Sequence, residues 1–271
     1  PAPEASQEPV KRPLSMFVTL RDGLEEMVQV LPGKLKGDLR LDTAVTDVRK
    51  VDGRLSLKLN NGQRLVADAV VLATPAYCAA GLIKEIAPKA ATGLDAIRYV
   101  STGTISLAFR RQDVDLPEGF GLVIPRSEQR LINAVTITST KFDHRAPDDR
   151  VLLRVFFGGS RRPEMMDVDD DQLLTLVLSE LDAVLSVEAQ PLFRRIYRWR
   201  RANPQYDVGH LERVGAIEEA LPAGLYVTGS PYRGIGIPDC VHQGQLTAEQ
   251  IASDLAAVDV QEMPVPEPAA L

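Results

Sequence analysis

The stretch GLYVTGSPYRGIGIPDCVHQG, residues 224–244, decides the fold of this 271-residue chain. Its apolar start predicts a short strand that ends near Thr228. A loop with Gly234 and Gly236 follows, and then a helix that can begin with Pro238, because proline is favoured in the first turn of a helix. The free amide groups and the dipole of a helix start favour an anion or an electron-rich oxygen. Because glycine has no Cβ, a flat cofactor can also approach this backbone closely.

The glycine spacing in this loop differs from that of a dinucleotide-binding turn. The segment GIGIPD, residues 234–239, lacks the third glycine of Gly-x-Gly-x-x-Gly. An alternative is that the glycines serve turns alone. The residues by themselves therefore predict either an anion or cofactor site at a helix start, or a plain glycine-rich loop.

The elements expected around this stretch are those of a mixed α/β protein. Asp22 can cap an early helix, which Pro32 can kink or shorten. Asn61-Gly62 is typical of a β-hairpin turn, and the apolar run 69–73 predicts a strand buried on both faces. Helices are expected at 23–36, 75–84, 88–96, 170–185 and 238–255, and strands at 39–41, 45–51, 55–59, 64–66, 69–73, 99–111, 121–124, 131–138, 151–157, 193–199 and 225–228.

The composition, 45% hydrophobic and 25% charged, is that of an ordinary globular protein. A formal net charge of -6 argues against a nucleic acid partner, and no apolar run approaches the ~20 residues of a spanning helix. Cys78 and Cys240 lack the spacing of a metal site or a disulfide framework, so both are expected to be buried small residues in a reducing, cytoplasmic protein. The Pro/Ala/Glu-rich ends, 1–14 and 258–271, are expected to be disordered tails.

Several segments resemble one known family in the order in which they occur. Residues 228–240 resemble the closing signature of protoporphyrinogen oxidase-type flavoproteins, and residues 68–75 resemble their second cofactor-domain strand. Other similar segments are 17–24, 119–126, 145–147, 158–161 and 199–210. The chain therefore resembles the C-terminal part of a protoporphyrinogen or coproporphyrinogen oxidase, within the flavin-containing amine oxidase superfamily.

The resemblance implies an α/β (α+β mixed) fold with an incomplete FAD-binding domain and a substrate domain. Residues 15–75 and 222–257 are expected to form the partial FAD-binding domain. Residues 76–221 are expected to form the substrate-binding domain, with a mixed or antiparallel sheet and helices. Family members open with a Rossmann unit whose Gly-x-Gly-x-x-Gly turn holds the cofactor pyrophosphate, and this sequence contains no such turn. We therefore expect a fragment without its N-terminal Rossmann unit, which alone binds FAD weakly or not at all and is inactive.

The resemblance also assigns residues to the cofactor and the substrate. The expected FAD contacts are Val45, Ala73, Thr74, Gly229, Ser230, Gly236, Ile237, Pro238 and Asp239. The amides near Ile237 and Asp239 are expected to face the pyrimidine oxygen of the flavin, whereas Ser230 lacks the carboxylate that the superfamily often has at this place. The expected substrate contacts are Leu107, Val123 and Ile137, with ordinary core residues as the alternative. No catalytic acid–base residue and no metal ligand is expected.

The implied activity is the FAD-dependent oxidation of protoporphyrinogen IX or coproporphyrinogen III to the porphyrin, in haem biosynthesis, with dioxygen as the electron acceptor. The flavin carries the redox chemistry, and the protein supplies orientation and a dry pocket. Two alternatives stay open: another amine oxidase-like or desaturase-like flavoprotein, and a non-catalytic porphyrin-binding module. The residues choose neither the porphyrinogen nor the oligomeric state.

A group of arginines surrounds the single tryptophan, Trp199. Its members are Arg194, Arg195, Arg198, Arg200 and Arg201. Arginine binds carboxylates through paired hydrogen bonds, so the group can meet the propionates of a porphyrinogen, or anionic lipid in a peripheral membrane contact. The plainer alternative is a solvated strand face.

Overall fold

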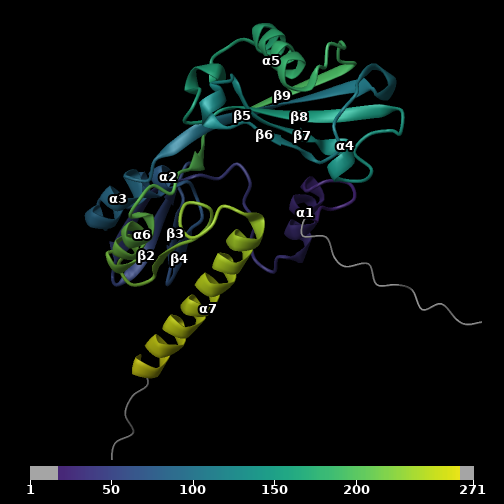
Figure 1. The fold of residues 1–271 in the computed structure, drawn as a ribbon. Coiled ribbons are helices and arrows are strands. Elements are labelled where there is room, and N and C mark those ends of the chain that lie inside the picture. The colour runs from purple at the N-terminus through teal and green to yellow at the C-terminus, as the bar shows by residue number, and fades with distance from the viewer. Residues whose placement is uncertain (1–17, 263–271) are drawn as a thin grey trace, which may run out of the picture.

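A computed structural model of the protein describes residues 18–262, with side chains up to residue 257. Its elements form two bodies joined by a pair of long strands, as Figure 1 shows. One body is a five-stranded sheet with a helix on it, and the other combines two small sheets with three helices. Within the described residues, α1 (Glu25–Val30) and α7 (Ile237–Glu262) contribute no residue to either hydrophobic core.

The larger sheet is antiparallel, with the strand order β6-β7-β8-β5-β9. Its strands are β5 (Tyr99–Arg110), β6 (Gly121–Val123), β7 (Ile132–Ile137), β8 (Arg150–Gly158) and β9 (Phe193–Pro204). Successive side chains of a strand point to opposite faces. The core residues of β5, β7 and β8 all lie on the face that α5 (Asp170–Leu185) covers, which we call the covered face. The opposite face, here the open face, carries Thr104, Ser106, Arg154, Phe156, Tyr197 and Trp199.

Helix α5 forms where an acidic cap precedes an amphipathic run. The Asp169 carboxylate accepts hydrogen bonds from the backbone N–H groups of Asp171 (3.1 Å) and Gln172 (3.0 Å), which satisfies amides that a helix start leaves unpaired. Its buried side chains recur every four residues, as one helical face requires; they are Leu173, Val177, Leu181 and Leu185. The bounds of this helix are as predicted.

The second body is built on two small sheets. Strands β1 (Val45–Val51), β2 (Arg54–Leu59) and β3 (Arg64–Ala67) form an antiparallel meander, and β4 (Val70–Leu72) pairs in parallel with β10 (Leu225–Val227). Gly62 has φ +85° in the turn between β2 and β3, as its hairpin position predicts. Helices α2 (Ala76–Ile83), α3 (Pro88–Asp95) and α6 (His210–Glu219) pack with these strands in one core.

This packing places the passage between the two bodies differently from the predicted domain boundaries. Helices α2 and α3 and the apolar residues of α6 belong to the core of the second body, not to that of the large sheet. The chain therefore passes to the large sheet along β5, which is later in the sequence than the predicted boundary at 76. It returns along β9, which is earlier than the predicted boundary at 221. The reason is that the apolar faces of these helices are buried against β4 and β10.

The N-terminal helix is shorter than the predicted range 23–36, and the predicted cap at Asp22 is wrong. The helix breaks after Val30 into a short 3-10 turn, Leu31–Lys34, which contains Pro32. Its N-cap residue is Leu24, whose apolar side chain accepts no capping hydrogen bond. The expected strand at 39–41 is absent, since those residues have no strand partner. The apolar stripe of this helix is exposed, with Val28 at 64%.

Three further differences concern a missed helix, the two cysteines and the C-terminal helix. Helix α6 was not expected, because few apolar residues mark it; it buries His210, Val214 and Ile217. Cys78 is exposed and Cys240 half-buried, so the prediction that both are buried is wrong. Helix α7 continues into the expected tail as far as Glu262. The tails at 1–14 and 263–271 lie outside the described residues.

Candidate functional site

Four of the expected cofactor residues meet at one edge of the parallel pair β4 and β10. Leu72 lies beside Val227 in the register of the two strands, and the N–H of Thr228 donates to the carbonyl of Leu72 (3.2 Å). The strands therefore end side by side, and the segments 73–74 and 229–230 leave them at the same edge. The carboxyl edge of a parallel sheet is where open α/β sheets bind ligands. The structure thus brings Ala73, Thr74, Gly229 and Ser230 together.

A single carboxylate organises the loop between β10 and α7. The Asp239 Oδ2 atom accepts a hydrogen bond from the N–H of Gly236 (3.2 Å). A Cβ added to Gly234, whose φ is +150°, would lie 2.5 Å from the Asp239 Cβ, and one added to Gly236 would lie 2.9 Å from Oδ2. The two glycines therefore leave the space that the aspartate side chain fills, and this packing explains the spacing of the segment GIGIPD.

The entrance of α7 keeps backbone donors free. Within the described residues, the N–H groups of Ile235, Ile237 and Asp239 make no hydrogen bond, while Cys240 N–H already donates to the Gly236 carbonyl (2.9 Å). The side chains of Ile235 and Ile237 are 53% and 45% exposed beside these donors. A 26-residue helix adds its dipole to the same place. Apolar side chains next to unpaired amides suit a flat ring that carries an acceptor oxygen.

A tyrosine–histidine pair holds this loop from α6. The Tyr206 hydroxyl donates to the Ser230 carbonyl (2.7 Å) and accepts from the Gly234 N–H (2.8 Å). Its ring stacks on His210 with centroids 4.0 Å apart, and His210 Nε2 lies 2.8 Å from the Tyr232 carbonyl. Burial raises the pKa of Tyr206, and the hydrogen bond from Gly234 opposes that rise. The pair therefore fixes both ends of the segment that precedes α7.

We expect Tyr206→Phe to lower the free energy of unfolding by about 1–3 kcal/mol, because two hydrogen bonds are lost and each contributes ~0.5–1.5 kcal/mol net. Exchange of the Gly234 amide hydrogen should become faster at the same time. Tyr197→Phe is the matched control, since within the described residues the Tyr197 hydroxyl has no hydrogen-bond partner. Urea denaturation and hydrogen exchange measure both effects. Equal changes in the two variants would contradict this role.

One expected cofactor residue, Val45, lies on another strand. Val45 opens β1 opposite Leu59 and is half-buried against the core of the second body. Pro238 and Asp239 are exposed at the α7 entrance. The FAD contact expected of Val45 therefore stays a prediction, and an ordinary core contact accounts for its position.

The expected substrate residues do not share one face of the large sheet. Leu107 is 0% exposed and Ile137 is 3% exposed, and both lie in the core beneath α5. Val123 is 79% exposed and pairs with Ala134 on the open face. The burial of Leu107 and Ile137 fits the alternative of plain core residues, because a ligand would have to displace α5 to reach them.

Most of the arginines around Trp199 are tied to the acidic start of α5. Arg194 pairs with Asp171 (2.7 Å), Arg198 with Asp170 (2.5 Å) and Arg200 with Asp167 (2.8 Å). Arg201 has φ +46° and lies over the ring of Tyr77 at 4.1 Å. Four of the five arginines therefore already have partners within the protein, and only Arg195 does not.

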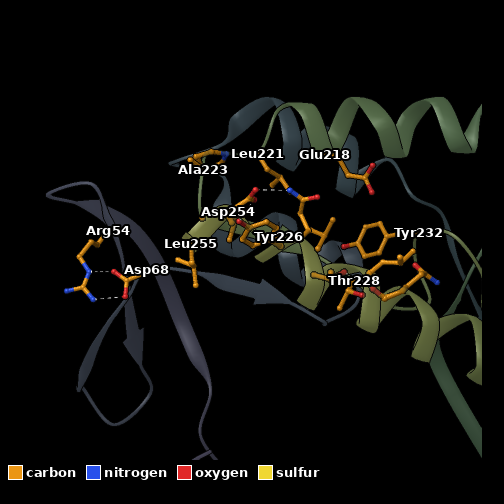
Figure 2. Close-up of a pocket in the computed structure, with 18 of the residues that line it drawn as sticks. Arg54, Asp68, Glu218, Leu221, Ala223, Tyr226, Thr228, Tyr232, Asp254 and Leu255 are labelled. Atoms are coloured by element: carbon orange, nitrogen blue, oxygen red, sulfur yellow. Dashed lines mark hydrogen bonds and ion pairs between the residues drawn. The ribbon is translucent and has the colours of Figure 1, made fainter. Parts of the chain in front are cut away.

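A cavity of about 1050 Å³ lies between β10, the loop before it and α7 (Figure 2). Its polar walls include the Arg54–Asp68 ion pair, and the Tyr226 hydroxyl donates to Asp254 (2.7 Å). Burial, and then that hydrogen bond, raise the pKa of Tyr226 to about 12. The hydroxyl of Tyr232, a residue only 2% exposed, has no partner here. None of the expected cofactor or substrate residues lines this cavity.

Two findings bear on other classes of site. No helix within residues 18–262 has the length and apolar character needed to cross a membrane. In the same residues no three His, Cys, Asp or Glu side chains are grouped so as to hold a metal ion.

The sequence did not identify the residues that fix the loop between β10 and α7 through hydrogen bonds and ring contacts. Tyr206, His210 and Tyr232 have no spacing that announces a role, and Tyr206 reaches Gly234 only after the chain has folded. The signals were that residues 199–210 resemble a recurrent family segment and that Tyr232 lies within the signature 228–240. The residues that touch the loop from a distant element are those that a linear pattern cannot identify.

Known proteins share this architecture. Residues 6–252 match the family model for flavin containing amine oxidoreductases. The coproporphyrinogen III oxidase of Bacillus subtilis is 33% identical over 89% of this chain and 52% of its own length, and that of Propionibacterium freudenreichii is 34% identical over 88% and 45%. A crystal structure of a protein from Exiguobacterium sp. 255-15 has a TM-score of 0.79 and 30% identity, covering 90% of this chain and 54% of that one.

The sequence matches and the structural similarity point to the same family. The chain spans about half the length of the curated relatives it matches, and the matched region includes both the α7 entrance and the large sheet. The family resemblance seen in the sequence motifs is thereby confirmed: this chain belongs to the flavin containing amine oxidoreductase family.

Proposed function

We propose that this chain supplies the flavin-facing loop and the substrate-facing sheet of an FAD-dependent porphyrinogen oxidase, which acts on coproporphyrinogen III or protoporphyrinogen IX with dioxygen as the acceptor. The observation that carries this proposal is the α7 entrance, where free amides lie beside exposed isoleucines. The names of the two bacterial relatives support the substrate class. Both cysteines are free, which supports a reducing compartment such as the cytoplasm.

The residues at the loop have the chemistry that FAD requires. The N–H groups of Ile237 and Asp239 would face the pyrimidine side of the flavin ring, where they and the helix dipole stabilise negative charge. Gly229 and Ser230 would follow the ribityl chain, since a Cβ added to Gly229 would meet only Pro231, at 3.9 Å. The bound flavin supplies the two-electron acceptor chemistry. The chain's own contribution is to orient the ring and to exclude water.

The pyrophosphate half of the site must come from a further unit in this proposal. Within the described residues, β4 and β10 form a parallel sheet of only two strands, whereas parallel sheets are normally larger and covered on both faces. Helix α7 runs beside the second body (Figure 1), where the Tyr226 hydroxyl donates to Asp254, and its residues Val241 and Leu246 are about half exposed. We propose that a Rossmann unit with a Gly-x-Gly-x-x-Gly turn pairs with β4 and packs on α7. The chain alone would then bind FAD weakly and be inactive.

An FAD titration of two proteins tests this proposal. The first is the present chain, for which we expect no stoichiometric flavin complex. The second is the Bacillus subtilis relative with its matching segment replaced by this chain, for which we expect bound FAD and formation of fluorescent porphyrin from coproporphyrinogen III. Tight FAD binding by the chain alone would overturn the incomplete-site proposal. A flavin-loaded chimera that oxidises amines but no porphyrinogen would overturn the substrate class.

A further inference from the structure

The open face of the large sheet carries two neighbouring rows of side chains across three strands. In one row, Tyr197 of β9 and Phe156 of β8 flank Thr104 of β5. In the next row, Arg195 of β9 and Arg154 of β8 flank Ser106. Strands are spaced by ~4.8 Å and alternate residues by ~7 Å. The outer members of each row are therefore about 10 Å apart, and the two rows are about 7 Å apart.

The two arginines of this face differ from those of the covered face. Arg154 and Arg195 are both exposed, and within the described residues neither guanidinium group makes a hydrogen bond or an ion pair. On the covered face, Arg194, Arg198 and Arg200 are all neutralised by aspartates at the start of α5. The chain carries a net charge of -6, so carboxylates for pairing are abundant elsewhere. The open face thus carries two guanidinium groups without a neutralising carboxylate, although the protein as a whole is acidic.

Aromatic side chains lie directly beside these arginines. The rings of Tyr197 and Trp199 are stacked, with centroids 5.7 Å apart and planes 19° apart, and they are 49% and 46% exposed. The centre of the face is polar but small, with Thr104 and Ser106 between the larger side chains. A surface of this kind suits a broad apolar ring that carries carboxylates on its rim, because rings pack on aromatic faces and guanidinium groups bind carboxylates in pairs.

We propose that the open face is the carboxylate-reading subsite for a tetrapyrrole, in which Arg154 and Arg195 bind side-chain carboxylates while Tyr197 and Phe156 contact the macrocycle. This inference rests on the proposed function, because it names the residues that recognise its substrate. Two arginines at opposite sides of one row favour a ligand with carboxylates on more than one side. A four-carboxylate coproporphyrin should therefore bind more tightly than the two-carboxylate protoporphyrin.

Fluorescence of the single tryptophan tests the proposal on the present chain, since Trp199 lies on the same face. The probes are coproporphyrin III, protoporphyrin IX and the tetramethyl ester of coproporphyrin III. We expect quenching by coproporphyrin III, and we expect Arg154→Gln and Arg195→Gln each to weaken binding about tenfold, and together about a hundredfold if the sites are independent. The ester should bind weakly and equally to all variants.

The matched control is Arg200→Gln, which removes one charge from the same strand on the covered face. Unchanged coproporphyrin binding in the Arg154 and Arg195 variants, an equal loss in Arg200→Gln, or no quenching at all would overturn the proposal. A dimer that covers Trp199 and dissociates in Arg154→Gln, seen by sedimentation, would assign the face to a second copy instead. Failure of the chimera to bind FAD or oxidise porphyrinogen, with porphyrin binding intact, would reject the proposed function alone.

Discussion

Gly103→Ala is expected to destabilise the protein by about 3 kcal/mol, at the upper end of the range for overpacked cores. Gly103 lies directly opposite Phe157 in the pairing of β5 with β8, and the phenyl ring lies over the glycine. An added Cβ would lie 2.2, 2.4 and 2.8 Å from the Cζ, Cε2 and Cε1 atoms of that ring, which is shorter than any ordinary carbon–carbon contact. Phe157 is 1% exposed and stands in the core beneath α5, so the ring has no free space to move into.

A double-mutant cycle tests whether the Phe157 ring causes the loss of stability expected at Gly103. Phe157→Ala alone should cost about 3–5 kcal/mol, because it leaves a cavity. In that background Gly103→Ala should be neutral or stabilising by up to about 1 kcal/mol, since the clash is gone and glycine is unfavourable inside a strand. Unfolding in urea, followed by circular dichroism, gives the coupling free energy. Additive losses would show that the ring does not occupy the space over the glycine.

Gly81→Ala is the control for the alanine substitution itself. Gly81 is inside α2, is exposed, and a Cβ added there would meet no other atom within 4 Å. Alanine is favoured over glycine inside a helix by about 1 kcal/mol, so this variant should be slightly more stable than the parent protein. The change in the free energy of unfolding should therefore have opposite signs at positions 103 and 81, because only Gly103 has no space for an added Cβ.

The elements that the sequence predicted are those whose cause is local. Helix α5 follows from its Asp169 cap and from apolar residues four apart, and the β2–β3 turn follows from Asn61-Gly62. The α7 entrance followed from glycine and proline positions, although the N-terminal helix did not keep its predicted length, because Pro32 interrupts it. Local chemistry therefore predicted most strand and helix positions and the loop that carries the site.

What the sequence did not predict depends on contacts between distant elements. Apolar and polar residues alternate along β5, but the face that α5 covers is decided only in the folded protein, so the positions of Leu107 and Val123 relative to a substrate were open. The hydrogen bond between Tyr206 and Gly234 joins the segment after β9 to the loop between β10 and α7. Burial of α2 and α3 with β4 similarly moved the domain boundary.

The loop before α7 gives the prediction with the largest expected effect on the proposed cofactor site. Gly234→Ala should weaken FAD binding by the flavin-loaded chimera about 100-fold, which corresponds to about 3 kcal/mol. Two costs add up at this position. The φ of +150° is a conformation that L residues rarely adopt, and the new Cβ would lie 2.6 Å from the Asp239 Cγ. Asp239 would have to leave the Gly236 N–H that it now accepts from.

A graded series separates this cause from general damage. Gly236→Ala should weaken FAD binding only about tenfold, because its added Cβ meets one carboxylate oxygen at 2.9 Å, and its backbone is not left-handed. Gly215→Ala, inside α6 with open space around it, should leave FAD binding unchanged. Unfolding of the large-sheet core should be the same in all three variants. An equal loss of FAD affinity at positions 234 and 215 would contradict the proposal. If the position of the Asp239 carboxylate is what supports FAD binding, the loss should be larger the closer the added Cβ lies to that carboxylate.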